Sequence, residues 1–161
     1  MATQSSSPAP RPLAGEAGSP CYKRPESVLV VAYTAADEVL VLLRRQPPDF
    51  WQSVTGSLRW DETDPLDAAQ RELREETGLD DEVEIIACGV INRFSILPPW
   101  RHRYAPNVTE NVEHVFRVWL PERRPIVLNP AEHGEYQWLP RTAAAAKVAS
   151  WTNRDAILNL P

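Results

Sequence analysis

The stretch GSLRWDETDPLDAAQRELREETGL, residues 56–79, predicts the central helix of this 161-residue chain. Apolar side chains recur at intervals of three and four residues, as on an amphipathic helix, at Leu66, Ala69 and Leu73. Pro65 suits a first helical turn, and Asp64 before it is suited to cap the amino end. Gly78 is a natural stop at the carboxyl end. The stretch therefore predicts a helix with one face on the core.

The carboxyl end of this predicted helix carries three glutamates, Glu72, Glu75 and Glu76. Glu72 and Glu76 are four residues apart, so they lie on one face of a helix. Pairs such as Arg71 with Glu75 stabilise an exposed helix by ~0.3–0.5 kcal/mol each. Acidic groups at a carboxyl end, however, oppose the helix dipole and repel one another, and carboxylate oxygens are ligands that Mg²⁺ prefers. Two interpretations stay open: a solvated charged helix, or a metal site.

The composition is that of an ordinary globular domain, with 24% charged and 43% hydrophobic residues. The length corresponds to about one domain and allows a real core. The net charge of −5 argues against a protein that coats nucleic acid or binds a membrane surface, because such proteins usually carry clustered Lys and Arg. We therefore expect neither a nucleic-acid polymer nor a membrane as partner. An acidic protein that handles phosphates needs local arginines or bridging cations.

Residues 1–22 are rich in Ser, Pro, Ala and Gly, so we expect a disordered tail followed by a single domain at 23–161. Cys21 and Cys88 lack the spacing of a metal pair and are expected to be free thiols, which favours a reducing compartment. No run approaches the ~18 apolar residues of a membrane span, and no signal-peptide core is present. The expected location is the cytoplasm.

The rest of the sequence predicts a mixed sheet with helices on its faces, an α/β or α+β layered domain. Strands are expected at 27–33, 38–45, 50–56, 83–91, 114–120, 125–128 and 135–139. The first two form a hairpin, and a loop rich in Pro, Trp and Arg spans 97–107. The carboxyl end is predicted to be helical at 142–151 and 153–160, with Asn153 as a candidate cap.

Residues 56–79 also resemble the Nudix box, the signature of hydrolases that cleave nucleoside diphosphates linked to another moiety. The matching positions are Gly56, Glu62, Arg71, Glu72, Leu73, Glu75, Glu76, Gly78 and Leu79. The resemblance implies an α/β/α sandwich around a mixed β-sheet, which agrees with the element order above. Eight residues separate Glu62 from Arg71, where the family usually has one fewer. Asp64 is the expected insertion, so the departure affects the placing of Glu62 and not the register of the glutamates.

Further segments resemble a narrower group of the family, the dihydroneopterin triphosphate pyrophosphatases of bacterial folate synthesis. They are YKRPESVLVV (22–31), PDFWQSVTGSL (48–58), RHRYAP (101–106), YQWL (136–139) and SWTNRDAI (150–157). The resemblance implies a Mg²⁺-dependent enzyme, with Mn²⁺ as a substitute, that converts dihydroneopterin triphosphate to the monophosphate and pyrophosphate. A (deoxy)nucleoside triphosphate pyrophosphohydrolase, of the dATP or nucleotide-sanitising type, is the alternative within this chemistry. A catalytically silent binding module is a third interpretation, which the intact glutamates disfavour.

The same resemblance implies roles for individual residues. The expected Mg²⁺ ligands are Glu72, Glu76 and Glu132, with Glu113 as the fallback for the third. The catalytic base is one of Glu72, Glu75 and Glu132, and substrate contacts are expected at Lys23, Arg44, Thr55 and Ser150. Two further features stay open: the cluster RHR (101–103) either binds phosphate or is a solvated loop, and Trp51, Trp60 and Trp100 either stack on a ring or fill the core. A monomer and a homodimer are both compatible with the sequence.

Overall fold

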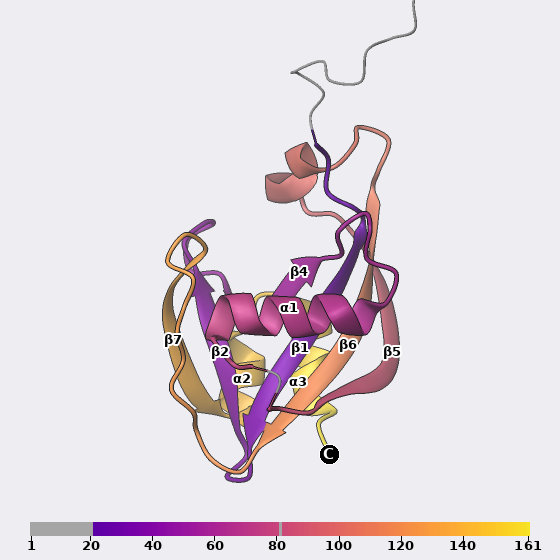
Figure 1. Cartoon of the computed structure of the whole chain (residues 1–161). Coiled ribbons are helices and arrows are strands. Elements are labelled where there is room, and N and C mark those ends of the chain that lie inside the picture. Colours follow the sequence, from indigo (N-terminus) through magenta and orange to yellow (C-terminus); the bar gives the residue numbers. More distant parts are fainter. Residues whose placement is uncertain (1–20, 81) are drawn as a thin grey trace, which may run out of the picture.

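A mixed seven-stranded β-sheet forms the centre of the computed structural model, with helices on both of its faces (Figure 1). The structure describes residues 21–80 and 82–161, so the tail predicted at 1–22 lies almost entirely outside the described residues. The elements in chain order are β1 (Glu26–Thr34), β2 (Glu38–Arg44), β3 (Trp51–Gln52), β4 (Val54–Ser57), α1 (Pro65–Thr77), β5 (Ile85–Ser95), the 3₁₀ turn η1 (Pro98–Arg103), β6 (Glu110–Leu120), β7 (His133–Pro140), α2 (Arg141–Lys147) and α3 (Trp151–Leu158).

The sheet has the strand order β3-β2-β1-β6-β5, with β4 paired to β1 and β7 paired to β2. The pair β1 and β6 is parallel, with Val30 opposite Phe116, and the other pairs are antiparallel. The predicted hairpin of β1 and β2 is confirmed, with Tyr33 opposite Val39. The sheet is therefore mixed, as the sequence predicted.

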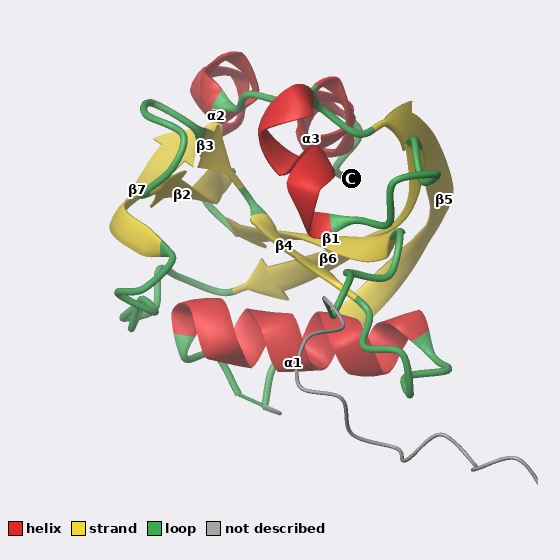
Figure 2. Cartoon of the chain, turned by 90° about the horizontal axis from the view of Figure 1, so that it is seen from above, coloured by secondary structure: helices red, strands yellow, loops and turns green. Residues whose placement is uncertain are grey.

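Helix α1 covers one face of the sheet, and α2 and α3 cover the other, as the view along the sheet shows (Figure 2). Successive residues of β1 alternate between the two faces, so each face has its own core. Val28 and Val30 pack with Leu73 of α1, whereas Leu29 packs with Ile157 of α3. These two cores hold three layers together and confirm the predicted α/β/α sandwich.

The sheet splits beside β1, and this split positions the site described below. Strand β6 pairs along the whole of β1. On the opposite edge, β2 pairs with β1 only at its carboxyl end, and β4 pairs with its amino half, Ser27 to Val30. Strands β2 and β4 therefore share one edge of β1 and separate from each other. As part of β4, the segment around Gly56 lies in the sheet, between α1 on one face and α2 and α3 on the other.

Several predictions about individual elements are wrong in detail. Residues 125–128 do not form a strand; Val127 instead donates its N–H to the carbonyl of Thr77 at the end of α1, 2.9 Å away, so the segment runs past the helix and not along the sheet. The cap of the last helix is Ser150 and not Asn153, because Ser150 Oγ accepts the N–H of Asn153 at 3.2 Å. The helix predicted at 142–151 is interrupted at 148–150, and the predicted loop at 97–107 contains the turn η1.

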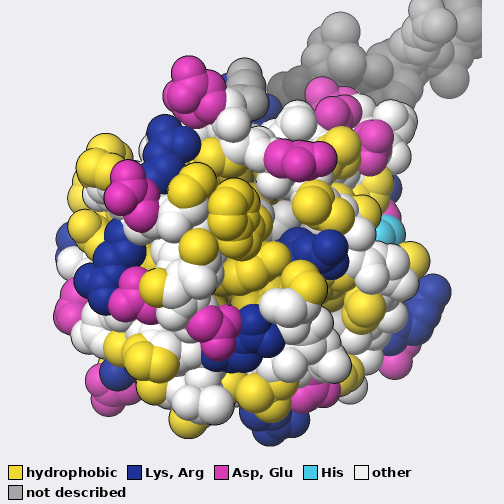
Figure 3. Space-filling model, turned by 90° about the horizontal axis from the view of Figure 1, so that it is seen from below, with side chains coloured by type: hydrophobic (Ala, Val, Ile, Leu, Met, Phe, Trp, Pro, Cys, Tyr) yellow, Lys and Arg dark blue, Asp and Glu magenta, His cyan; other side chains and the backbone are white. Residues whose placement is uncertain are grey.

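The surface carries charges of both signs. On the face shown in Figure 3, Lys and Arg side chains lie among Asp and Glu side chains, around gathered hydrophobic side chains. A continuous basic surface, which a nucleic-acid polymer requires, is therefore not a feature of this face. Among the described residues, none of the helices has the length and apolar character needed to cross a membrane.

Candidate active site

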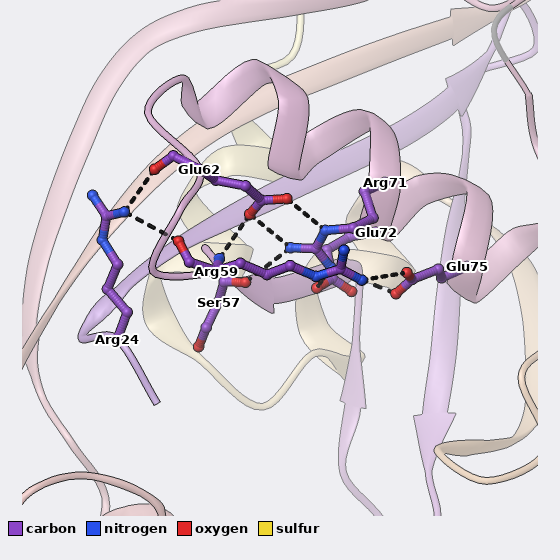
Figure 4. Close-up of polar contacts among 7 residues, drawn as sticks. All are labelled: Arg24, Ser57, Arg59, Glu62, Arg71, Glu72 and Glu75. Carbon is purple, nitrogen blue, oxygen red and sulfur yellow. Dashed lines mark hydrogen bonds and ion pairs between the residues drawn. The ribbon is translucent and has the colours of Figure 1, made fainter. Parts of the chain in front are cut away.

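Helix α1 begins after a loop that is fixed by an ion pair. Asp64 caps the helix, with Oδ1 accepting the N–H of Leu66 at 2.9 Å, and Gly78 ends it with a φ of +73°. One carboxylate oxygen of Glu62 accepts a hydrogen bond from Nε of Arg71 at 2.7 Å, and the other accepts one from Nη2 at 3.0 Å (Figure 4). Both predicted caps of α1, Asp64 and Gly78, are thus confirmed. The extra residue, Asp64, is the cap itself, and it leaves Glu62 paired with Arg71.

Glu72 lies at the centre of this network. Its Oε1 accepts Nη1 of Arg71 at 2.6 Å, and burial raises the pKa of its carboxyl (Figure 4). The carboxyl group lies against Gly56 of β4: a Cβ built on Gly56 would be 2.1 Å from Oε1 of Glu72. Only glycine leaves this space free, which explains why a glycine stands at this position. Glu75, by contrast, is half-exposed and lies 3.4 Å from Arg59 and 3.5 Å from Arg71.

Three ligand groups gather near Glu72. A carboxylate oxygen of Glu76, one of Glu132 and a ring nitrogen of His133 lie within 4.8 Å of one another. Glu76 is 2% exposed, its Oε2 lacks a hydrogen-bond partner among the described residues, and burial with the charges of Glu72 and Glu132 raises its pKa well above the ordinary value. Burial and nearby Arg44 lower the pKa of His133 to about 4, so its ring is neutral at pH 7.

These residues fit a divalent cation. An orphaned, buried carboxylate oxygen on Glu76 is costly unless it is protonated or meets a cation. Carboxylates and a neutral imidazole are suitable ligands for a divalent ion, and the separation of the three groups allows a shared ion. The structure brings together the predicted Glu72, Glu76 and Glu132; Glu113, the fallback, is absent from this described cluster. His133 was missed, because its burial depends on where β7 begins.

A cavity of about 330 Å³ lies between the sheet and α3, next to the acidic cluster. All four residues predicted to bind substrate line it: Lys23, Arg44, Thr55 and Ser150. Arg103 of η1 lines the same cavity, which favours the phosphate interpretation of RHR over the solvated loop. Burial and the neighbouring charges of Arg103 and Arg44 lower the pKa of Lys23, so the three cations crowd one another. Such a cluster of cations is a suitable environment for a polyanion.

The apolar part of the cavity has a fixed aromatic wall. Phe50 and Trp100 both line it, and their rings meet edge to face with centroids 5.0 Å apart. The guanidinium of Arg44 lies over the Trp100 ring, 5.9 Å from its centroid. Trp100 is therefore a wall of the cavity, whereas Trp51 is a buried core residue and Trp60 is exposed. The open question about the tryptophans has a different answer at each position.

Side chains that line the cavity are also tied to the fold. The hydroxyl of Thr55 donates a hydrogen bond to the carbonyl oxygen of Val28, with Oγ1 at 2.9 Å. Asn153, which was predicted to be a cap, bridges α3 to the connection before β4. Its Oδ1 accepts the N–H of Ser53 at 2.7 Å, and its Nδ2 donates to Ser53 Oγ at 2.8 Å. Asn153 therefore fixes the strand that carries Thr55 and Gly56.

Comparison with known proteins places this geometry in a family. A NUDIX domain model matches residues 23–160. The dihydroneopterin triphosphate diphosphatase of Escherichia coli (strain K12) is 49% identical over 140 residues, which cover 84% of this chain and 91% of that protein. The Haemophilus influenzae protein of the same name is 41% identical over 84% of this chain and 87% of its own.

The same relationship is evident in three dimensions. The solved structure of the E. coli dihydroneopterin triphosphate pyrophosphohydrolase superimposes with a TM-score of 0.79 at 48% identity, covering 84% of this chain and 94% of that chain. A putative NUDIX hydrolase from Listeria monocytogenes, at 24% identity and a TM-score of 0.70, shares the fold. The sequence match, the superposition and the occupied positions of the box agree, and the chain belongs to the Nudix family.

Proposed function

We propose that this Nudix protein is a pyrophosphohydrolase that converts dihydroneopterin triphosphate to dihydroneopterin monophosphate and pyrophosphate in folate synthesis. The observation that carries the proposal is the cavity, which joins three cations and an aromatic wall in one space, with Glu72 and Glu132 close enough for their charges to act on Lys23. Relatives that share 49% and 41% of their aligned residues with this chain are named for that substrate. The cavity volume also suits a ligand of that size.

Each part of the substrate has a counterpart in the cavity. The flat pterin ring fits beside Phe50 and Trp100, since aromatic rings favour stacked or edge contacts. The triphosphate fits between Lys23, Arg44 and Arg103, because guanidinium groups bind phosphate oxygens bidentately. The linkage between the α and β phosphorus atoms then lies near the acidic cluster. Water supplies the oxygen and the protons that balance the cleavage into monophosphate and pyrophosphate.

The acidic cluster is the proposed binding site for Mg²⁺, with Mn²⁺ as a substitute. Glu72, Glu76 and Glu132 are the proposed ligands, and the neutral ring of His133 is close enough to join them. When bound, divalent ions neutralise phosphate charge and lower the pKa of bound water. Glu72, Glu75 and Glu132 remain the candidates for the catalytic base.

Purified protein tests the proposal directly. Pyrophosphate release is measured with Mg²⁺ for dihydroneopterin triphosphate and for a panel of nucleoside triphosphates, and again after chelation with EDTA. Highest kcat/KM for dihydroneopterin triphosphate, with loss of turnover in EDTA, is the expected result. Equal or faster turnover of a nucleotide would overturn the folate assignment in favour of the nucleotide alternative. Failure to hydrolyse any of these compounds would favour the silent binding module.

The proposal extends to the context in which the protein acts. Residues 23–161 form the proposed catalytic domain, since the family match and the described elements fall in this range. Cys21 and Cys88 are free, as in a protein of a reducing compartment, which supports the proposed cytoplasmic location. A small-molecule triphosphate is the proposed partner, and the active form is either a monomer or a homodimer.

A further inference from the structure

The buried wall of the cavity contains a carboxyl group that the proposed chemistry does not use. Glu113 of β6 lines the cavity and is 5% exposed. It is absent from the ion pairs of the described residues, and the nearest amide donor, Nδ2 of Asn92, is 3.5 Å from its Oε1. Burial raises its pKa, and hydrogen bonding by Thr152 and Asn92 only partly offsets this. A buried carboxylate with so few donors is costly unless a ligand supplies them.

A second buried polar side chain beside Glu113 has one atom without a hydrogen-bond partner. Asn111, two residues earlier, is on the same face of β6 and is 3% exposed. Its Nδ2 donates to Ser27 Oγ at 2.7 Å, but its Oδ1 has no hydrogen-bond partner among the described residues. Ser27 is directly opposite Glu113 in the parallel pair of β1 and β6. Glu113 and Asn111 therefore both offer acceptor oxygens at the buried wall of the cavity that they line.

Acceptors on the wall of a cavity select a ligand edge that carries N–H groups. A 2-amino-4-oxopyrimidine ring, present in both pterins and guanine, has two adjacent donors: the 2-amino group and the neighbouring ring N–H. The two oxygens of a carboxylate match this pair. Adenine has a donor beside an unprotonated ring nitrogen, and the lone pair of that nitrogen would face a carboxylate oxygen. Adenine binding is therefore unfavourable, because it leaves a buried oxygen of the carboxylate without a donor.

We infer that Glu113, assisted by Asn111, is the specificity residue that binds the 2-amino-4-oxopyrimidine edge of the substrate ring at the buried wall of the cavity. This inference rests on the proposed function in one respect: the ring must enter this cavity while the triphosphate lies at Lys23, Arg44 and Arg103. It deepens that function because it names the chemical class that the site selects. Pterin and guanine triphosphates are favoured, and adenine triphosphates are rejected.

Wild-type protein provides a test that needs no substitution. GTP and ITP differ only in the 2-amino group, so their kcat/KM ratio isolates one of the two proposed hydrogen bonds. We expect GTP to exceed ITP by about 10- to 100-fold, the range for a hydrogen bond to a charged group. ATP, which has the mismatched edge, is expected to be poorer than GTP by a larger factor. Equal kcat/KM values for GTP and ITP would overturn the inference.

The Glu113→Gln variant completes a cycle with the same substrates. We expect the GTP to ITP ratio to fall toward one and the preference for dihydroneopterin triphosphate over dATP to fall by at least about tenfold. Glu110→Gln, an exposed glutamate of the same strand, is the matched control and should retain both ratios. Thermal unfolding checks that the Glu113 variant is folded. If the variant does not fold, the comparison of GTP with ITP in the wild type tests the inference. A retained GTP to ITP ratio in folded Glu113→Gln would refute the assignment.

The two proposals fail in different ways. Wild-type protein that hydrolyses GTP well but not dihydroneopterin triphosphate would contradict the folate assignment while leaving the role of Glu113 intact. Wild-type protein that prefers dihydroneopterin triphosphate, with no effect of Glu113→Gln on base selectivity, would contradict only the role of Glu113. Competition by unphosphorylated neopterin and adenosine separates ring binding from turnover, and neopterin is expected to compete better. Stronger competition by adenosine would overturn the inference.

Discussion

The Gly56→Ala substitution tests whether the Glu72 carboxylate must lie against β4. A Cβ on residue 56 would be 2.1 Å from Cδ and Oε1 of Glu72 and 2.5 Å from Oε2. Heavy atoms that are not bonded pack at about 3.5 Å or more. The carboxylate must therefore retreat by about 1.4 Å, away from the position in which it meets Arg71 and the acidic cluster.

The expected cost falls on activity and not on the fold. A misplacement of about 1 Å in a catalytic arrangement lowers the rate by roughly 100-fold, which corresponds to about 2.7 kcal/mol of activation free energy. The atoms in the way are the end of a side chain, which moves more easily than backbone. Gly56 is not among the glycines with positive φ, so alanine is not strained there. We expect the free energy of unfolding to change by no more than about 1 kcal/mol.

The assay pairs pyrophosphate release with thermal unfolding for Gly56→Ala and for Gly134→Ala. A Cβ added to Gly134 would meet no atom within 4 Å, and the φ of this residue is not positive, so its alanine variant should match wild type in kcat and melting temperature. Wild-type kcat in folded Gly56→Ala would refute the reasoning, since Glu72 would then tolerate displacement. A large loss of stability in Gly56→Ala would show instead that the glycine serves the fold.

Three further predictions concern the acidic residues. Glu76→Gln should lose most of the turnover. The metal-free variant should nevertheless be at least as stable as wild type, because the substitution removes a buried carboxyl group with an unpaired oxygen. Thermal unfolding with and without Mg²⁺ checks the ligand role, since Mg²⁺ should raise the melting temperature of the wild type alone. EDTA should abolish turnover, and added Mg²⁺ should restore it. Glu62→Gln should lower the free energy of unfolding by about 1–3 kcal/mol at pH 7. Since Arg71 lowers the Glu62 pKa to about 2, this stabilisation is complete above about pH 4.5 and lost as the pH falls toward 2, so urea unfolding should show wild type and variant converging there.

Local signals predicted the parts of the fold that local physics determines. The apolar stripe and the turn chemistry of Asp64, Pro65 and Gly78 predicted α1 correctly, because amphipathicity and caps are encoded within a few residues. The segment at 125–128 was predicted to be a strand because it is short and apolar. Val127 is 70% exposed, however, and its N–H bonds to Thr77, so the partner that decides its conformation is distant in sequence. Propensity alone does not contain that partner.

The site shows the same division. The spacing of the glutamates identified the acidic cluster, because residues three and four apart share a helix face. His133 and Asn153 had no such spacing: one is buried where β7 begins, and the other bridges α3 to Ser53 across 100 residues. Glu113 was considered only as a metal ligand, since the strand was predicted to begin at residue 114 and the sequence pattern assigned this carboxylate to neither face of the sheet. Its place at the buried wall of the cavity follows from the pairing of β6 with β1.

Like charges repel one another within two groups in the free site, one of cations and one of carboxylates. Together they explain how an acidic protein would bind a polyanion. The pKa of Lys23 is lowered by burial and by the crowding of Arg103 and Arg44, and the pKa of Glu76 is raised by burial and by the crowding of Glu72 and Glu132. A triphosphate relieves the first crowding, and divalent cations relieve the second. Since the phosphates themselves attract those cations, each ligand makes the other bind more favourably, and the coupling is reciprocal. Substrate affinity should therefore depend on metal concentration, and metal affinity on substrate, because neither ligand alone neutralises both clusters.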